Sequence, residues 1–97
     1  MSTIPVILTI AGSDCSGGAG IQADIKTISA LKGYAASVIT AVTAQNTTGV
    51  QAVYPIPPDI VRAQIISVTD DLQPAAIKIG MVHNAAIVHT IAECLQK

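Results

Sequence analysis

Residues 7–25 read ILTIAGSDCSGGAGIQADI and join an apolar run to a glycine-rich turn and then to a helical pattern. The apolar run covers residues 4–10 and is mostly β-branched, which predicts a strand buried on both faces. Four glycines follow: Gly12, Gly17, Gly18 and Gly20. Because glycine has no Cβ, such a loop permits positive φ and lets a ligand approach the backbone closely.

The pattern becomes helical after the glycines, with Ile21, Ile25 and Ile28 on one face. We predict a helix over residues 18–31 that ends at Gly33 as the residue after the C-cap. The free N–H groups at the start of this helix would point into the glycine loop, where they favour an oxygen-bearing ligand.

The rest of the chain alternates strands and helices. We expect a buried strand over residues 36–43, a polar turn over 45–49 and an edge strand over 49–56. A helix begins near Pro58, a buried strand covers residues 75–79, and a last helix follows the N-cap Asn84. The expected inward stripes of these two helices are Val61, Ile65, Val68 and Leu72, and then Ile87, Val88, Ile91 and Leu95. This order predicts an α/β fold with a mainly parallel sheet and flanking helices.

The predicted fold is incomplete. The chain has 97 residues, of which 51% are hydrophobic and only 11% charged, against about a quarter charged in ordinary domains. Strands buried on both faces need more sheet than residues 1–97 supply, so the excess apolar surface must be covered by protein. We expect residues 1–97 to be one N-terminal part of a larger domain, and we also expect a homo-oligomer.

Composition excludes several classes of function. The net charge is −1 and the five basic residues are scattered, which argues against nucleic acid. No apolar run reaches the length of about 20 residues that spans a bilayer, so we expect no membrane partner. The N-terminus lacks a basic segment, and Cys15 and Cys94 lack metal-type spacing, so we expect a cytoplasmic protein without a signal peptide.

The glycine loop has three interpretations besides a small-molecule cradle. A Walker A loop is excluded because Gly18 stands where its lysine would be. Residues 18–23 fit the dinucleotide pattern G-x-G-x-x-A, but no acidic residue lies about 20 residues further on for a ribose hydroxyl. A purely structural tight turn stays open, although turn geometry alone does not call for four glycines.

Asp24 is the most informative polar residue. It lies beside the apolar face of the first predicted helix, where a carboxylate could accept a hydrogen bond from a substrate hydroxyl. An acidic residue in an early helical turn is also favourable for electrostatic reasons alone. Asp14 is the weaker candidate, because an aspartate in a loop is most often a turn-former.

Polar and adaptable side chains follow the two later strands of the parallel sheet. Gln45 and Asn46 come just after the predicted end of the second strand, and Gly80 and Met81 follow the third. Ligands of parallel sheets bind at this edge. The Gln45 amide suits the edge of a heteroaromatic ring, and Met81 could form a wall over it. An ordinary polar turn and a core methionine are the alternatives.

The remaining reactive side chains favour structural roles. Cys15 lies near a helix N-terminus, but the sequence places no histidine beside it, which argues against nucleophilic catalysis. His83 and His89 are six residues apart, unlike a metal-binding pair on a helix, so we interpret them as surface histidines and expect no metal site.

The runs LTIAGSDCSGGAGIQADIKTISALKGYAASVITAVTAQNTTGVQAVYPI and VTDDLQPAAIKIGM together resemble the N-terminal part of hydroxymethylpyrimidine/phosphomethylpyrimidine kinases. The segments SGGAGIQAD, TAQNT and KIGM carry the resemblance, which covers nearly the whole chain. It implies a ribokinase-like fold and ATP-dependent phosphorylation of 4-amino-5-hydroxymethyl-2-methylpyrimidine, and then of its monophosphate, in thiamine biosynthesis.

The resemblance also implies site residues. Asp24 would contact the pyrimidine near its hydroxymethyl end, Gln45 would contact the ring, and Gly12, Ala19 and Met81 would line the pocket. In this family the anion hole, the catalytic base and most ATP and Mg²⁺ contacts lie in a C-terminal half. We therefore expect no catalytic residue here, no ATP or Mg²⁺ bound by this chain alone, and no activity of the isolated chain. A pyridoxal or pyridoxine kinase and a non-catalytic pyrimidine-binding module stay open.

Overall fold

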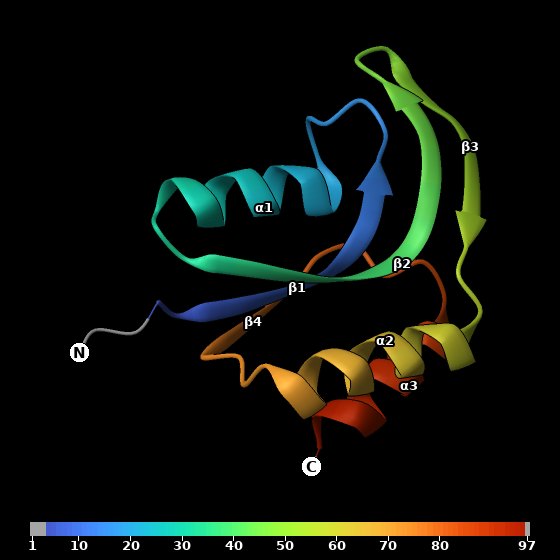
Figure 1. The fold of residues 1–97 in the computed structure, drawn as a ribbon. Coiled ribbons are helices and arrows are strands. Elements are labelled where there is room, and N and C mark those ends of the chain that lie inside the picture. The colour runs from blue at the N-terminus through green and yellow to red at the C-terminus, as the bar shows by residue number, and fades with distance from the viewer. Residues whose placement is uncertain (1–3, 97) are drawn as a thin grey trace.

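The structure is a computed structural model that describes residues 4–96. These residues form a sheet in the order β3-β2-β1-β4 with three helices (Figure 1). The strands are β1 (Val6–Asp14), β2 (Tyr34–Asn46), β3 (Gly49–Pro55) and β4 (Ala76–Ile79), and the helices are α1 (Gly20–Ala30), α2 (Pro58–Asp71) and α3 (Ala85–Leu95). β1 runs parallel to β2 and β4, and β3 runs antiparallel to β2. The predicted α/β class is confirmed.

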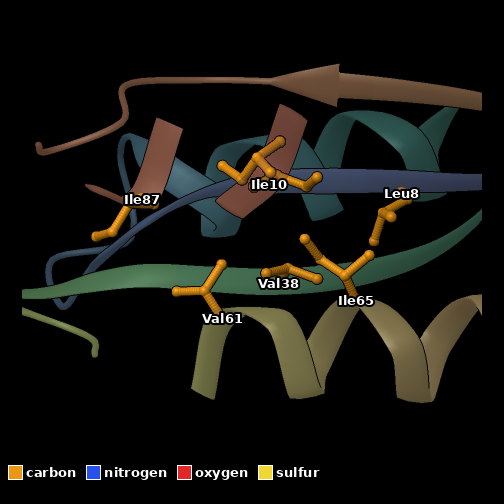
Figure 2. Close-up of a cluster of buried hydrophobic side chains, with 7 residues drawn as sticks. Leu8, Ile10, Val38, Val61, Ile65 and Ile87 are labelled. Carbon is orange, nitrogen blue, oxygen red and sulfur yellow. The ribbon is translucent and has the colours of Figure 1, made fainter. Parts of the chain in front are cut away.

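Helices cover both faces of the sheet, α1 on one and α2 with α3 on the other (Figure 1). The buried core lies on the α2 and α3 side (Figure 2). It consists of Leu8, Ile10 and Val38 from the strands, Val61 and Ile65 from α2, and Ile87 and Ile91 from α3. Because side chains alternate along a strand, Thr9 between Leu8 and Ile10 faces α1. This alternation brings a polar group of β1 against the first helix.

α2 and α3 begin where the sequence predicts. Pro58 occupies the first turn of α2, where its missing N–H costs no hydrogen bond, and Asp59 joins it there. The Asn84 side chain caps α3, since its Oδ1 accepts a hydrogen bond of 2.9 Å from the N–H of Ile87. Both predicted helix starts are confirmed.

The predicted ends of the first two strands are wrong. β1 continues to Asp14 and β2 to Asn46, so Gly12 and Gln45 lie in strands and the turn is reduced to residues 47–48. The pairing persists through a register shift between Ala11 and Ser13. The hydrophobic pattern ended earlier because it reports burial, whereas backbone pairing continues through glycine and polar residues.

The end of α1 also differs from the prediction. Lys32, not Gly33, adopts the left-handed conformation, with φ of 67°. A Cβ on Gly33 would lie 2.9 Å from the Cγ2 of Ile28. Gly33 is therefore required by close packing on the helix rather than by its own backbone angle.

Residues 76–79 form the strand that was predicted over residues 75–79, but the prediction that this strand is buried is wrong. All four residues of β4 are exposed, and β4 pairs only with β1 among residues 4–96. On α3, Val88 is likewise 50% exposed although it was predicted to face inward. A strand at the sheet edge has no neighbour on its outer side, so its apolar residues stay uncovered.

Candidate functional site

A cavity of about 270 Å³ opens where β1, β2 and β4 end. This is the edge at which parallel α/β sheets bind ligands, because the chain leaves the sheet there in loops. Its lining combines the end of β1 and the glycine loop (Ala11, Gly12, Ser13, Asp14, Ala19, Gly20), the β2–β3 arm (Ala41, Thr43, Gln45, Val50, Val53) and β4 with the loop after it (Lys78, Gly80, Met81, His83).

Four predicted site residues line this one cavity: Gly12, Ala19, Gln45 and Met81. They come from β1, the β1–α1 loop, β2 and the segment after β4, so only the folded chain brings them together. Asp24, the fifth, is absent from the lining. Their role in binding a substrate stays a prediction.

Asp14 organises the glycine loop. Its Oδ1 accepts hydrogen bonds from the N–H and the hydroxyl of Ser16, at 2.9 and 2.7 Å, and its Oδ2 accepts from the N–H groups of Gly18 and Ala19, at 3.1 and 2.8 Å. The Ser16 hydroxyl is the main cause of a lowered pKa of the Asp14 carboxyl, and it outweighs burial. The prediction that Asp14 is a turn-former is confirmed.

Two of the loop glycines are required by the turn itself. Gly17 and Gly20 have φ of +87° and +59°, and a Cβ on Gly20 would lie 2.3 Å from the carbonyl oxygen of Gly12. Gly12 and Gly18 are not crowded, since their nearest atoms to a Cβ lie 3.6 and 3.9 Å away. Turn geometry therefore explains two glycines and leaves Gly12, in the cavity wall, to another role.

Gln45 is fixed by its backbone. The Cys15 thiol lies 3.2 Å from both the N–H and the carbonyl oxygen of Gln45, so it ties the loop to β2. The Thr43 hydroxyl lies 2.9 Å from the Gln45 Oε1 and 2.8 Å from the Ser13 carbonyl, and its single proton serves one of them at a time. Within the described chain no group bonds the Gln45 amide nitrogen, which leaves donors for a ligand.

Asp24 faces the sheet, as predicted. The Thr9 hydroxyl donates to its Oδ2 at 2.6 Å, and the Lys78 ammonium lies 3.1 and 2.9 Å from Oδ1 and Oδ2. Burial raises the pKa of the Asp24 carboxyl, but the hydrogen bonds from Thr9 and Lys78 and the charge of Lys78 outweigh it, so the net pKa is lowered. Asp24 itself does not line the cavity, but its ion-pair partner Lys78 does.

Sequence reasoning missed Lys78 and His83. Lys78 lies inside the apolar run that predicts the strand over residues 75–79. A charged side chain within such a run, two residues before Gly80, is the signal that could have identified it as a cavity residue. His83 lines the cavity and both histidines are exposed, as predicted.

Over residues 4–96, no three His, Cys, Asp or Glu side chains gather as a metal site would need. None of the helices described is long and apolar enough to cross a membrane.

Residues 14–97 match the phosphomethylpyrimidine kinase family. The chain is 60% identical to a hydroxymethylpyrimidine/phosphomethylpyrimidine kinase of Escherichia coli over 93% of its own length and 34% of the relative's. A crystal structure of phosphomethylpyrimidine kinase from Clostridium difficile superposes with a TM-score of 0.92 at 55% identity, covering 95% of this chain and 40% of that one. Bacillus subtilis pyridoxal kinase, solved as an ADP complex, gives a TM-score of 0.88 at 38% identity, covering 97% and 37%. The chain thus spans about a third of the curated relative's length.

Proposed function

The chain belongs to the phosphomethylpyrimidine kinase family, and from that premise we propose that it supplies the pyrimidine-binding part of an ATP-dependent kinase of thiamine biosynthesis. The complete enzyme would transfer a phosphoryl group to the hydroxymethyl group of 4-amino-5-hydroxymethyl-2-methylpyrimidine, and then to the resulting monophosphate. The proposal rests on one observation above all, the convergence of Gly12, Ala19, Gln45 and Met81 on one cavity.

Each of these residues suits a small flat heterocycle. Gly12 and Ala19 leave room beside the loop, and the Met81 thioether offers an adaptable apolar wall. The Gln45 amide can donate to a ring nitrogen and accept from an amino group. We assign Asp24 to the hydroxymethyl end, beside Lys78, where its carboxylate would accept a hydrogen bond from the hydroxyl.

We assign ATP and Mg²⁺ to the part of the complete kinase beyond this chain. Within residues 4–96 no three His, Cys, Asp or Glu side chains gather in one place. Phosphoryl transfer needs positioning and charge stabilisation around the moving group. We therefore expect the isolated chain to bind pyrimidine without turning it over.

Calorimetry with the hydroxymethylpyrimidine tests the pocket. Gln45→Leu in the complete gene product should weaken binding at least about tenfold, because it removes a hydrogen-bonding group from the ring edge. Gln51→Leu is the matched control, since Gln51 is exposed on β3 and bonds the Gly49 carbonyl rather than lining the cavity. No binding by the wild-type protein would end the proposal. ADP formation by the isolated chain that depends on the pyrimidine would refute its inactivity.

A pyridoxal kinase is the second candidate, because the fold also matches Bacillus subtilis pyridoxal kinase at 38% identity. Both substrates are flat nitrogen heterocycles with a CH₂OH group. The higher identity to pyrimidine kinases favours the first candidate. Turnover of both substrates by the complete gene product separates the two, and binding without turnover there would indicate a non-catalytic module.

The two free cysteines, Cys15 and Cys94, favour a reducing cytoplasm as the place where the protein acts.

A further inference from the structure

The pair Lys78–Asp24 joins β4 to α1 beside the cavity. We propose that Lys78 is a positioning residue that holds the Asp24 carboxylate in place for the hydroxyl-bearing end of the ligand. The inference rests on the proposed function, which assigns that end of the pocket to Asp24. It adds a residue that carries no assigned role in the binding of the pyrimidine.

Side chains from two neighbouring strands contact the Asp24 carboxylate. Thr9 on β1 and Lys78 on β4 are register partners, so their side chains rise on the same face, the one that α1 covers. Thr9 bonds one carboxylate oxygen and the Lys78 ammonium contacts both. The Asp24 side chain is 18% exposed and that of Lys78 is 51% exposed. The carboxylate is thus fixed from below by the sheet, and the ammonium stands at the cavity wall.

The chain leaves space for this ammonium. A Cβ on Gly80 would lie 3.2 Å from the Lys78 Nζ and 2.9 Å from the Cβ of Ala11. Any side chain at position 80 would therefore press on the ammonium or on β1. The absence of a side chain at Gly80 therefore lets the chain after β4 pass close to both β1 and the Lys78 ammonium.

Lys78 is the counter-charge of Asp24 among the described residues. Lys26, on the same helix as Asp24, bonds the Gly17 carbonyl instead, and His83 lines the cavity from the loop after β4. An ionised carboxylate only accepts hydrogen bonds, so a ligand hydroxyl must donate to it. Without Lys78 the largely buried carboxyl would keep only the Thr9 hydrogen bond, protonate more readily and be held less firmly in this position.

Three variants of the complete gene product test the inference: Lys78→Met, Lys78→Arg and the control Lys32→Met. Lys32 is an exposed lysine outside the cavity lining, and its loss changes the net charge equally. We measure the titration of the Asp24 carboxyl carbon by NMR and the affinity for hydroxymethylpyrimidine by calorimetry. Lys78→Met should raise the pKa of Asp24 and weaken binding roughly tenfold, Lys78→Arg should restore most of both, and Lys32→Met should change neither.

The two measurements separate failure of the inference from failure of the proposed function. If the wild-type protein binds no pyrimidine, the proposed function falls and takes the ligand role of Lys78 with it, whatever the titration shows. If the wild-type protein binds, and Lys78→Met binds equally well or leaves the Asp24 titration unmoved, the positioning role is overturned. Should Lys78→Met fail to fold by circular dichroism, Lys78→Gln replaces it, because glutamine keeps a donor and loses only the charge.

Discussion

Neighbouring groups lower the pKa of two aspartates, Asp14 in the cavity wall and Asp24 beside it. Asp14 is 3% exposed and satisfies four donors of its own loop, whereas Asp24 accepts from a strand hydroxyl and a lysine. Both carboxyls therefore have lowered pKa values, one by local turn hydrogen bonds and one chiefly by groups on other elements. Asp14 holds the glycine loop in shape, and Asp24 is paired with Lys78 of the cavity wall.

Acid should destabilise the protein through these two groups. A carboxyl whose folded pKa lies below its unfolded value stabilises the fold above the ordinary value of 3.8, and this contribution is lost as the pH falls below it. Thermal melts between neutral pH and about pH 3 should show a steeper fall for the wild type than for Asp14→Asn. Equal slopes would contradict the role of Asp14, and a slope remaining in Asp14→Asn is expected from Asp24.

Gly20→Ala should disrupt the loop, because its Cβ would meet the Gly12 carbonyl and its φ is +59°. We expect a loss of more than about 1 kcal/mol in the free energy of unfolding, measured by urea denaturation, together with weaker pyrimidine binding. Gly18→Ala is the matched control two residues earlier, since its Cβ would meet no atom closer than 3.9 Å. Equal effects of the two changes would refute this account of the loop.

At the level of elements, strand ends place the site. β1 and β2 extend beyond their apolar cores, so Gly12 and Gln45 project from strands and not from free loops. Strand residues are held by pairing on the sheet, which fixes the cavity wall more firmly than a turn would. Ala19 lies just before α1, and Met81 lies between β4 and α3.

Asn84 begins α3 directly after the segment that carries Met81 and His83. Asn84→Ala should lower the free energy of unfolding by about 1 kcal/mol, because the N–H of Ile87 loses its acceptor. His89→Ala, at an exposed position within α3, serves as the control. A guanidinium titration that leaves the Asn84→Ala midpoint unchanged would show that the cap contributes nothing.

At the scale of the whole molecule, the described sheet ends in two exposed edge strands, β3 and β4. The Cα radius of gyration is 13.6 Å, against about 12.5 Å for a compact domain of this length. Ile77 and Ile79 on the outer strand β4 are 39% and 47% exposed, and Met81 beyond them is 81% exposed. Unpaired backbone groups beside apolar side chains form a template for another strand.

The isolated chain should therefore self-associate through β4. Size-exclusion chromatography should show oligomers for the wild type and a shift toward monomer for Ile79→Lys, since a charge on an edge strand opposes strand addition. Ile66→Lys on α2 is the control, because Ile66 is 45% exposed and lies away from the edge. A monomeric wild-type chain would contradict both the edge argument and the expected homo-oligomer.

The sequence alone determined the order and kind of the elements. Helical spacing, β-branched runs, Pro58 and Asn84 report local preferences of the backbone, which need no partner to be read. It also indicated that Gln45 and Met81 share one edge, because parallel strands bring their carboxyl ends together. The resemblance to the kinase family implied that Gly12 and Ala19 line the same pocket. The family followed from short motifs in matching order.

Only the tertiary structure decided burial and long-range pairing. Residues 76–79 look like a buried strand in sequence, yet they are exposed because burial depends on what packs against both faces and the outer edge. Lys78 and Asp24 are separated by 54 positions, and no periodicity links them. Their contact exists because two neighbouring strands and one helix place both side chains on the same face, which is a property of the assembled sheet and not of any segment within it.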